Sequence, residues 1–275
     1  MEMEMEMEME MDLFSSLPEG CISAILSFTS PLDVCRSSTL SWGFKLASDS
    51  DTIWEKFLPS DYREIISRSA SPVVFHSKKQ LYFTLCDSPI LLDLGKMSFA
   101  VDKQSGKKCF MLPARQLWII WGDTPQYWTW ISLPESRFLE VAHLVKVCWF
   151  DIGGRLNTQI LSPETNYAAY FVFKTTEQNE GFEYTPMKAS VTLVGDIEDK
   201  TIYLKLQTNG EEDDAPLGPL PRRRKDGWME IELGELFNER DNDREVEIKL
   251  METEHLNWKS GLIVEGIELR PKVDA

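Results

Sequence analysis

"LVKVCWFDIGGRLNTQIL", residues 144–161, decides the fold class of this chain. The stretch holds two runs of β-branched and aromatic residues, 144–152 and 155–161, separated by Gly153-Gly154. Such runs are typical of β-strands, and glycine adopts without strain the positive φ that both central positions of a type I′ turn require. We therefore predict a β-hairpin that turns at Gly153 and Gly154.

Similar short runs lie on both sides of this stretch, each rich in β-branched or aromatic residues and bounded by turn residues. They are 96–102, 116–122, 167–174, 188–194, 201–207, 228–234, 245–251 and 262–270. Many short strands at regular spacing are typical of an antiparallel sandwich or jelly roll. Residues 105–109 (SGKKC) are expected to form a hairpin turn, and the polar, Pro/Gly-rich residues 208–227 a long surface loop.

The N-terminal part has a different rhythm, because from Leu13 to about Cys86 the apolar residues have helical spacing. Helix starts are expected at residues 30–33 (SPLD), where Ser caps and Pro suits the first helical position, and at Asp51-Thr52. Residues 77–86 are expected to form a further short helix. The expected fold class is α+β and multidomain, with a small all-α part followed by an all-β antiparallel sandwich.

Composition limits the class of protein. The formal net charge of −16 argues against nucleic-acid binding, because phosphates would be repelled. No apolar run approaches the roughly eighteen residues of a membrane span. The first residues, MEMEMEMEMEMD, do not resemble a secretory signal and are expected to be a disordered tail. Scattered cysteines without a CxxC pair fit reduced thiols, so we expect the protein in the cytoplasm and nucleus.

Residues that could carry chemistry are few. His76, His143 and His255 are far apart and lack the spacing of metal ligands. No Ser or Cys has a nucleophile-elbow context, and no pair of carboxylates stands out as acid and base. No catalytic residue, metal site or cofactor is therefore predicted. The basic run at residues 222–225 (RRRK) could be a nuclear import signal or an anion patch, although a solvated charge run is the alternative.

Residues 17–59, "LPEGCISAILSFTSPLDVCRSSTLSWGFKLASDSDTIWEKFLP", resemble an F-box. The matching features are Leu17-Pro18, aliphatic residues at helical spacing, SPLD at 30–33, and Trp54 with Leu58. Such a short unit cannot bury all its apolar faces alone. The resemblance implies docking to the Skp-type adaptor of a cullin-RING ubiquitin ligase, and through it to a cullin. The implied adaptor contacts are Leu17, Pro18, Ile22, Ile25, Leu26, Pro31 and Val34.

An alternative reading of this helical face also stands. Ile22 and Leu26 could pack on the β part of the chain instead of meeting a partner. Val34, Ser37 and Trp42 depart from residues that the F-box pattern often has, which weakens individual contacts more than the assignment itself.

From about residue 99 to residue 272 the chain resembles the phloem-lectin family, whose best-known member is the tobacco agglutinin Nictaba. Blocks such as "ARQLWIIWGDTPQYWTW" at 114–130 and "WKSGLIVEGIELRP" at 258–271 carry the resemblance. With the F-box, it implies a plant F-box protein with a lectin domain. The expected domains are a tail at 1–12, an F-box at 13–60, a helical linker at 61–95 and a lectin-like sandwich at 96–275.

The family implies that Trp121 and Trp128 flank a bound glycan and that Glu245 and Glu252 bind it. An indole covers the flat C–H face of a sugar, and carboxylates accept strong hydrogen bonds from hydroxyls. Glu245 and Glu252 are seven positions apart, so on one regular strand they would face opposite ways unless a bulge intervened. For the other tryptophans we expect Trp118 and Trp130 in the core or at its edge, and Trp149, Trp228 and Trp258 as packing residues.

These observations together predict a substrate-recognition subunit of an SCF-type ubiquitin ligase that catalyses nothing itself. The F-box would dock the adaptor, and the lectin-like domain would select a glycan or glycoprotein client. The alternative is a lectin-like protein–protein interaction module with a vestigial sugar site. An independent carbohydrate enzyme is disfavoured, because no carboxylate pair can be nominated.

Overall fold

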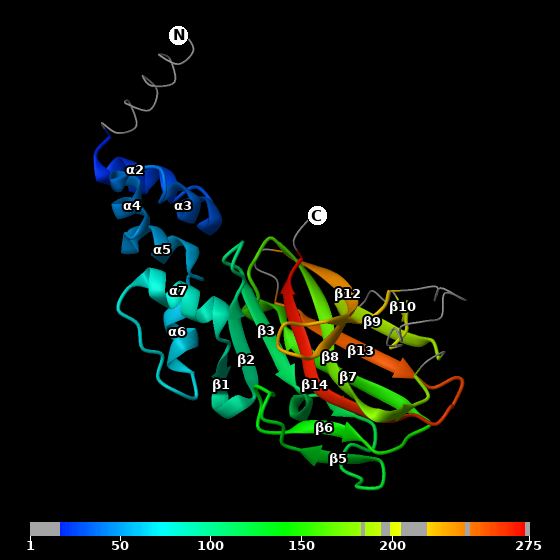
Figure 1. Ribbon diagram of the computed structural model, residues 1–275. Helices are drawn as coiled ribbons and strands as arrows, with labels where there is room; N and C mark the ends of the chain where they lie inside the picture. Colours follow the sequence, from blue (N-terminus) through cyan, green and yellow to red (C-terminus); the bar gives the residue numbers. More distant parts are fainter. Residues whose placement is uncertain (1–16, 183–184, 194–198, 205–218, 240–242, 273–275) are drawn as a thin grey trace. The chain divides into compact units, whose positions relative to one another are not determined.

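The computed structural model describes residues 17–182, 185–193, 199–204, 219–239 and 243–272 (Figure 1). These residues form two compact units. The helical unit contains residues 17–68, 72–89 and 100–107, and the β unit contains 69–71, 90–99 and the described residues from 108 onward. The acidic tail predicted at 1–12 lies outside the described residues. Helices followed by a sheet-rich antiparallel part confirm the expected fold class.

Short helices build the helical unit: α2 (Glu19–Leu26), α3 (Pro31–Ser37), α4 (Trp42–Ser48), α5 (Asp51–Phe57), α6 (Tyr62–Ser67) and α7 (Lys78–Asp87). The start of α3 shows why they begin where they do. The Ser30 hydroxyl accepts a hydrogen bond from the Asp33 backbone N–H at 3.1 Å, and the Asp33 carboxylate accepts one from the Ser30 backbone N–H at 3.4 Å. This capping box satisfies two N–H groups that a helix start otherwise leaves unpaired. The predicted starts of α3, α5 and α7 are confirmed.

Trp54 is the centre of the helical core. Its side chain is fully buried, and its indole N–H donates to the Ser48 carbonyl oxygen at 2.7 Å. The ring lies 5.2 Å from the rings of both Tyr82 and Phe83. The Trp54 indole therefore fastens α5 to α7, because a buried aromatic contributes both apolar area and a satisfied polar group.

Two antiparallel sheets make the β unit. Sheet A has the strand order β1-β2-β3-β14-β8-β12-β11, with β6 also paired to β14 and β5 to β6. Sheet B has the order β10-β9-β13-β7-β4. The strands of sheet A are β1 (Ile90–Leu92), β2 (Met97–Val101), β3 (Lys108–Pro113), β5 (Trp128–Ile131), β6 (Val141–Leu144), β8 (Thr165–Glu180), β11 (Arg222–Arg223), β12 (Met229–Asn238) and β14 (Ser260–Pro271). Those of sheet B are β4 (Trp118–Ile119), β7 (Phe150–Asn157), β9 (Met187–Leu193), β10 (Asp199–Ile202) and β13 (Glu245–Glu252).

The predicted hairpin at Gly153-Gly154 is wrong. Both glycines lie inside β7, where Gly153 pairs with Lys249 and Gly154 with Ile248 of β13. A Cβ atom at Gly153 would lie 2.1 Å from the Trp118 ring, and one at Gly154 would lie 2.7 Å from Leu117. The two glycines are therefore needed for close side-chain packing on the strand rather than for a turn.

Several other expectations need correction at their edges. Residues 145–149 connect β6 to β7, residues 158–160 form a 3-10 helix, and of 116–122 only Trp118–Ile119 is a strand. In the expected loop 208–227, Arg222–Arg223 is a short strand paired with β12, and 208–218 lie outside the described residues. The turn at 105–109 is confirmed, since Gly106 has a φ of 70° and donates its N–H to the Asp102 carbonyl oxygen.

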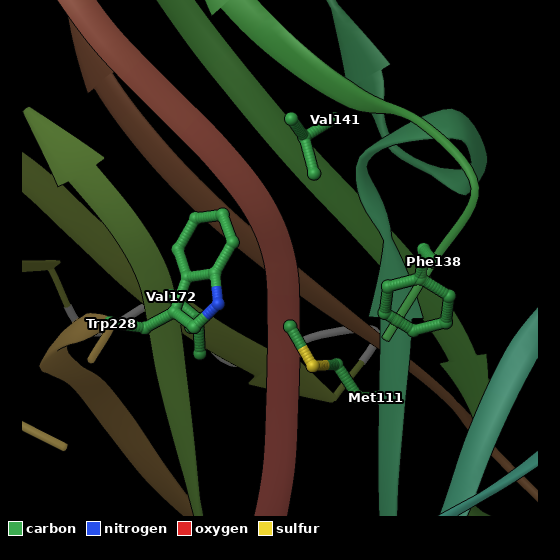
Figure 2. Packing of buried hydrophobic residues seen from close by; sticks show 5 residues of the cluster. All are labelled: Met111, Phe138, Val141, Val172 and Trp228. Carbon is green, nitrogen blue, oxygen red and sulfur yellow. The ribbon is translucent and has the colours of Figure 1, made fainter. Parts of the chain in front are cut away.

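A second cluster of buried apolar residues packs two connecting segments, β5–β6 and β11–β12, against sheet A. Figure 2 shows Phe138 and Trp228, from connections, gathered with Met111 of β3, Val141 of β6 and Val172 of β8. Trp228 is 1% exposed, which confirms its expected packing role. These segments carry the charged residues described below, so apolar packing positions the charges.

Candidate functional site

A set of large apolar side chains remains exposed on the helical unit. We call it the helical apolar surface, and its residues are Ile25, Phe28, Leu32, Leu40, Trp42 and Leu46. Phe28 is 85% exposed and Trp42 is 69% exposed. Both come from α2–α4 or their connections. Large apolar side chains left exposed in one small unit are candidates for contacts with a partner.

The structure divides the adaptor contacts that the resemblance implied. Pro18 and Ile25 are exposed and Leu17 is half-buried, so these three are accessible. The other implied contacts are buried, and their role at the adaptor stays a prediction: Ile22, Leu26, Pro31 and Val34. Ile22 lies beside α4, because a Cβ at Gly43 would be 3.6 Å from its Cδ1 atom. Buried aliphatics of this kind hold the helices together.

Sequence reasoning missed the most exposed members of the surface. Phe28 and Leu40 follow the ends of α2 and α3, and Trp42 begins α4. The Lys56 Nζ atom lies 4.6 Å from the Phe28 ring centre, and the Lys45 Nζ atom lies 5.4 Å from that of Trp42. The composition of the short connections could have identified them, because loops are usually polar and these contain large apolar residues.

The tryptophan-rich turn reverses the chain as expected but separates its two indoles. The Thr124 N–H donates to the Trp121 carbonyl oxygen, and the Trp128 N–H donates to that of Thr124. Trp121 is 40% exposed, with its ring 5.1 Å from that of Tyr127. Trp128 is 1% exposed and packs 6.2 Å from the Phe150 ring. Trp128 is therefore buried where Trp121 is exposed, and its stacking on a sugar stays a prediction.

The two carboxylates do not meet either. β13 pairs with β7 without a register shift, so Glu245 and Glu252 face opposite sides of sheet B. Glu245 is exposed, with Arg155 at 4.0 Å. Glu252 is 3% exposed and forms an ion pair with the fully buried Lys259. Burial alone would raise the pKa of Glu252, but hydrogen bonds from Lys259 and from backbone N–H groups lower it below its usual value. Binding of a sugar by Glu252 stays a prediction, and the carboxylate is already paired inside the protein.

Glu252 and Lys259 instead brace the loop between β13 and β14. The Glu252 carboxylate accepts backbone N–H bonds from Glu254 at 3.0 Å and His255 at 2.6 Å. The Lys259 ammonium donates to the Asn257 carbonyl oxygen at 2.8 Å. A buried ion pair whose remaining polar atoms are satisfied in this way favours one geometry. The residues between them, 253–258, are thereby held in place.

The remaining tryptophans divide between core edge and surface. Trp118 and Trp130 are half-buried as expected, and the Trp130 indole donates to the Gly122 carbonyl oxygen at 3.1 Å. Trp149 and Trp258 were expected to pack, which is wrong: they are 44% and 54% exposed. Their segments lie side by side, because Val147 and Lys259 form an isolated β-bridge.

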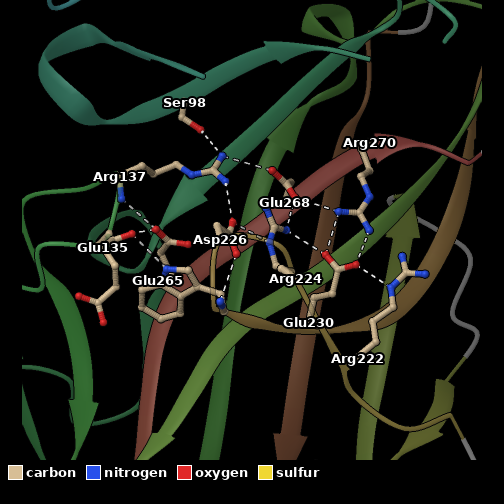
Figure 3. Close-up of polar contacts among 12 residues, drawn as sticks. Ser98, Glu135, Arg137, Arg222, Arg224, Asp226, Glu230, Glu265, Glu268 and Arg270 are labelled. Carbon is tan, nitrogen blue, oxygen red and sulfur yellow. Dashed lines mark hydrogen bonds and ion pairs between the residues drawn. The ribbon is translucent and has the colours of Figure 1, made fainter. Parts of the chain in front are cut away.

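Two arginines of the basic run at 222–225, Arg222 and Arg224, take part in an ionic network around the buried Glu230 and Glu268 (Figure 3). Arg224 contacts Glu230 at 2.9 Å and Glu268 at 2.5 Å, and its side chain is only 13% exposed. Arg270 contacts Glu230 at 2.6 Å. Burial alone would raise the pKa of Glu230, but Arg270 and Arg224 lower it to about 2. Arg222 also contacts Glu230, although its own side chain is 64% exposed. Arg223 and Lys225 are exposed, so the role of the run as an import signal stays a prediction.

Glu265 lies beside this network and differs from its other carboxylates. The Glu265 Oε1 atom accepts hydrogen bonds from the Ser136 hydroxyl at 3.2 Å and the Arg137 N–H at 3.0 Å. Its Oε2 atom is buried without a hydrogen-bond partner in the described part of the chain. Burial raises the pKa of Glu265. The network therefore holds one carboxyl group whose ionisation is disfavoured.

Two hollows stand out in the described part of the β unit. The larger, about 600 Å³, lies between β6, the end of β8 and the start of β14. The smaller, about 160 Å³, lies beside residues 251–255. Neither holds a metal-binding cluster: among the described residues, no three His, Cys, Asp or Glu side chains are grouped as metal ligands would be. Within the same residues, no helix has the length and apolar character needed to span a membrane.

Two family models match the chain: the F-box domain at residues 14–56 and phloem protein 2 at residues 107–271. The chain belongs to the phloem protein 2 family. It is 50% identical over 263 residues to the F-box protein PP2-B10 of Arabidopsis thaliana, covering 94% of each chain. To the F-box protein PP2-B15 of the same plant it is 40% identical over 279 residues, covering 93% of this chain and 96% of that one. Both resemblances read from the sequence are confirmed.

Proposed function

We propose that this F-box phloem protein 2 relative is a substrate receptor of an SCF-type ubiquitin ligase. The helical apolar surface docks a Skp-type adaptor, and through it a cullin, while the β unit selects glycans or glycosylated clients. Ubiquitin transfer belongs to other subunits, so the chain supplies recognition and no catalysis. A receptor of this type would act in the cytoplasm and nucleus. The observation that carries the proposal is the exposure of Phe28 and Trp42 within the F-box match.

The physical support is the apolar area that these side chains leave in water. Covering one large aromatic or aliphatic side chain contributes about 1.5–3 kcal/mol. Phe28, Leu40 and Trp42 are each more than two-thirds exposed, with Leu40 at 70%. Aromatic anchors of this kind dominate binding energy at protein interfaces.

Adaptor titration of a double variant tests the docking. Phe28→Ser with Trp42→Ser should weaken binding to the purified Skp-type adaptor by about 2–4 kcal/mol, roughly 30- to 1000-fold. Because both side chains are exposed, the melting temperature should not fall. Val74→Ser is the matched control, since Val74 is 73% exposed in the same unit but lies outside the F-box match. Equal affinity of double variant and wild type would contradict the docking proposal.

The lectin role rests on Trp121, whose ring is exposed beside Tyr127. A glycan array probed with the full chain tests it, with Trp121→Ala as the variant expected to lose signal. The alternative, a protein-binding module with a vestigial sugar site, is favoured by the burial of Trp128 and Glu252, which leaves the family-implied sugar contacts apart. No glycan signal together with retained client capture would favour that alternative.

A further inference from the structure

The larger hollow of the β unit is a groove shaped by an irregularity between β8 and β14. Ser260 pairs with Glu180, yet Leu262 pairs with Thr175, so residues 176–179 stand opposite Gly261 alone. Gly261 has a φ of 76°, and a Cβ there would lie 2.5 Å from the Thr176 hydroxyl oxygen. A bulge that re-aims side chains near a sheet end is a recurrent feature of binding sites. The groove is about 600 Å³, within the range of small-ligand sites.

The walls of the groove are polar and carry exposed acidic side chains. Glu177, Gln178 and Glu180 are exposed on the β8 side, and Ser260 faces them from β14. On the β6 side, burial lowers the pKa of His143, so this imidazole is neutral at neutral pH. Carboxylates, an amide, a hydroxyl and a neutral imidazole can accept and donate hydrogen bonds to sugar hydroxyls. The same carboxylates repel anionic groups.

Trp258 is not one of the groove-lining residues, but it lies next to several of them in the fold. Three groove-lining residues have a chain neighbour that lies beside Trp258. These neighbours are Lys146 after Val145, Gly181 after Glu180, and Lys259 before Ser260. The Lys146 Nζ atom lies 5.6 Å from the Trp258 ring centre, and a Cβ at Gly181 would lie 2.1 Å from the Trp258 carbonyl oxygen. The third neighbour, Lys259, is the buried partner of Glu252. The indole is thus 54% exposed on a braced loop.

The aromatic edge continues past the groove toward the tryptophan-rich turn. The Tyr127 carbonyl oxygen accepts the Val145 N–H at 2.9 Å, and the Tyr127 ring contacts Trp121. Val145 is itself 40% exposed and lines the groove. A polar groove with exposed aromatic rings on neighbouring segments suits a ligand with apolar ring faces and a hydroxylated edge.

We propose that a neutral oligosaccharide binds along this groove with one sugar ring stacked on Trp258. The proposal rests on the proposed lectin role and assigns its aromatic contact to Trp258 rather than to the buried Trp128. Glu177 and Glu180 select against sulfated and sialylated chains by charge repulsion. Preorganisation of the loop by the Glu252–Lys259 pair reduces the entropy lost on binding.

The experiment uses the full chain, titrated with cellotetraose, chitotetraose and mannotetraose and followed by tryptophan fluorescence and calorimetry. Trp258→Ala should weaken the tightest of these about tenfold or more, whereas Trp258→Phe should stay within about threefold, because it keeps an aromatic face. Phe237→Ala is the matched control: Phe237 is a half-exposed aromatic on β12, outside the groove, and its loss should leave binding unchanged.

The affinities for a neutral and a sulfated tetrasaccharide test whether the acidic side chains of the groove repel anionic ligands. Wild type should bind a sulfated form of the preferred tetrasaccharide about tenfold more weakly than the neutral form, and Glu177→Gln with Glu180→Gln should narrow that gap severalfold. Melting temperatures of all variants should match wild type, because every altered side chain is exposed.

The outcomes separate this proposal from the lectin role itself. If wild type binds none of the tetrasaccharides and no glycan on an array, both fail together. If Trp121→Ala abolishes glycan binding while Trp258→Ala and the double glutamine variant bind like wild type, the lectin role survives and the groove proposal is overturned. Protection of Trp258 from solvent quenching by a client polypeptide, with no effect of any tetrasaccharide, would also overturn it.

Discussion

In both the helical unit and the β unit, residues of the family pattern are buried. The two units differ in how the segments that carry their exposed aromatic rings are held. In both, residues implied as contacts are buried: Val34 in the helical unit and Trp128 in the β unit. On the helical unit, Trp42 is exposed, and the Lys45 ammonium lies 5.4 Å from its ring centre. On the β unit, the loop bearing Trp258 is braced by a buried ion pair. Residues of the family pattern thus stabilise the fold, whereas the contacts proposed above use exposed aromatic side chains.

The largest expected effect tests the β side of this comparison. Trp128→Ala should lower the free energy of unfolding by about 3–5 kcal/mol, because it opens a cavity against Phe150. Trp121→Ala should change it by less than about 1 kcal/mol, since Trp121 is exposed. Denaturant unfolding of both variants measures the difference. Trp128→Phe should cost less than Trp128→Ala, because the Trp128 indole N–H has no partner to lose in the described part of the chain.

If Trp128→Ala and Trp121→Ala melt alike, the distinction between a buried and an exposed indole in this turn is wrong. The same measurement would then restore Trp128 as a candidate sugar contact.

The next effect concerns the ionic network of the β unit, for which the helical unit has no buried counterpart among the described residues. The pKa of Glu230 is about 2 in the folded chain against an ordinary 4.5. Because the folded value is the lower one, its stabilisation is complete above pH 4.5 and is lost as the pH falls toward 2. The loss should be on the order of 3 kcal/mol.

Urea unfolding between pH 6 and pH 2.5 measures this loss. Glu230→Gln removes the titrating group, so its stability should fall less steeply with acid than that of wild type. An acid limb of equal slope in both proteins would show that other carboxylates carry the pH dependence.

A third, smaller effect separates fold from docking within the helical unit. Val34→Ala should lower the free energy of unfolding by about 2 kcal/mol, since it removes buried apolar groups. Leu40→Ser should leave it within about 0.5 kcal/mol and instead weaken adaptor binding. Thermal melting should show a loss of stability for Val34→Ala but not for Leu40→Ser. Adaptor titration should show a loss of affinity for Leu40→Ser. A Leu40→Ser chain that melts early but binds normally would reverse it.

The smallest effect is expected at Glu245. This carboxylate is exposed and its nearest cation, Arg155, lies at 4.0 Å. Glu245→Gln should therefore change the free energy of unfolding by less than about 0.5 kcal/mol. Tetrasaccharide affinity should also be unchanged, because Glu245 does not line the groove. A marked loss of affinity would return Glu245 to the sugar site that the family resemblance implied.

Local features of the sequence predicted the fold well. The cap at Ser30 and the helix starts at Asp51 and Lys78 depend on neighbours within a few positions, and so does strand periodicity. The seven-residue spacing of Glu245 and Glu252 correctly indicated opposite faces. Gly153 was misread, because the Trp118 ring that requires a glycine there lies 35 positions away in the sequence.

The candidate sites were harder to predict for the same physical reason. Arg224 is paired with Glu268, 44 positions away, so no local pattern distinguishes it from a solvated arginine. Burial of Trp128 and exposure of Trp258 depend on which strands cover each residue. Strand order is set by long-range pairing, which periodicity does not encode.

The position of β14 in sheet A has a consequence for biosynthesis. Residues 260–271 pair with β3, β6 and β8, yet the ribosome makes them after all three partners. Until β14 emerges, those strands present unpaired edges, and the β unit cannot close. The helices α2–α5 contact one another locally and are synthesised first. The nascent chain therefore completes its helical apolar surface before its β unit, so the proposed docking of a Skp-type adaptor could begin while the β unit is still being translated.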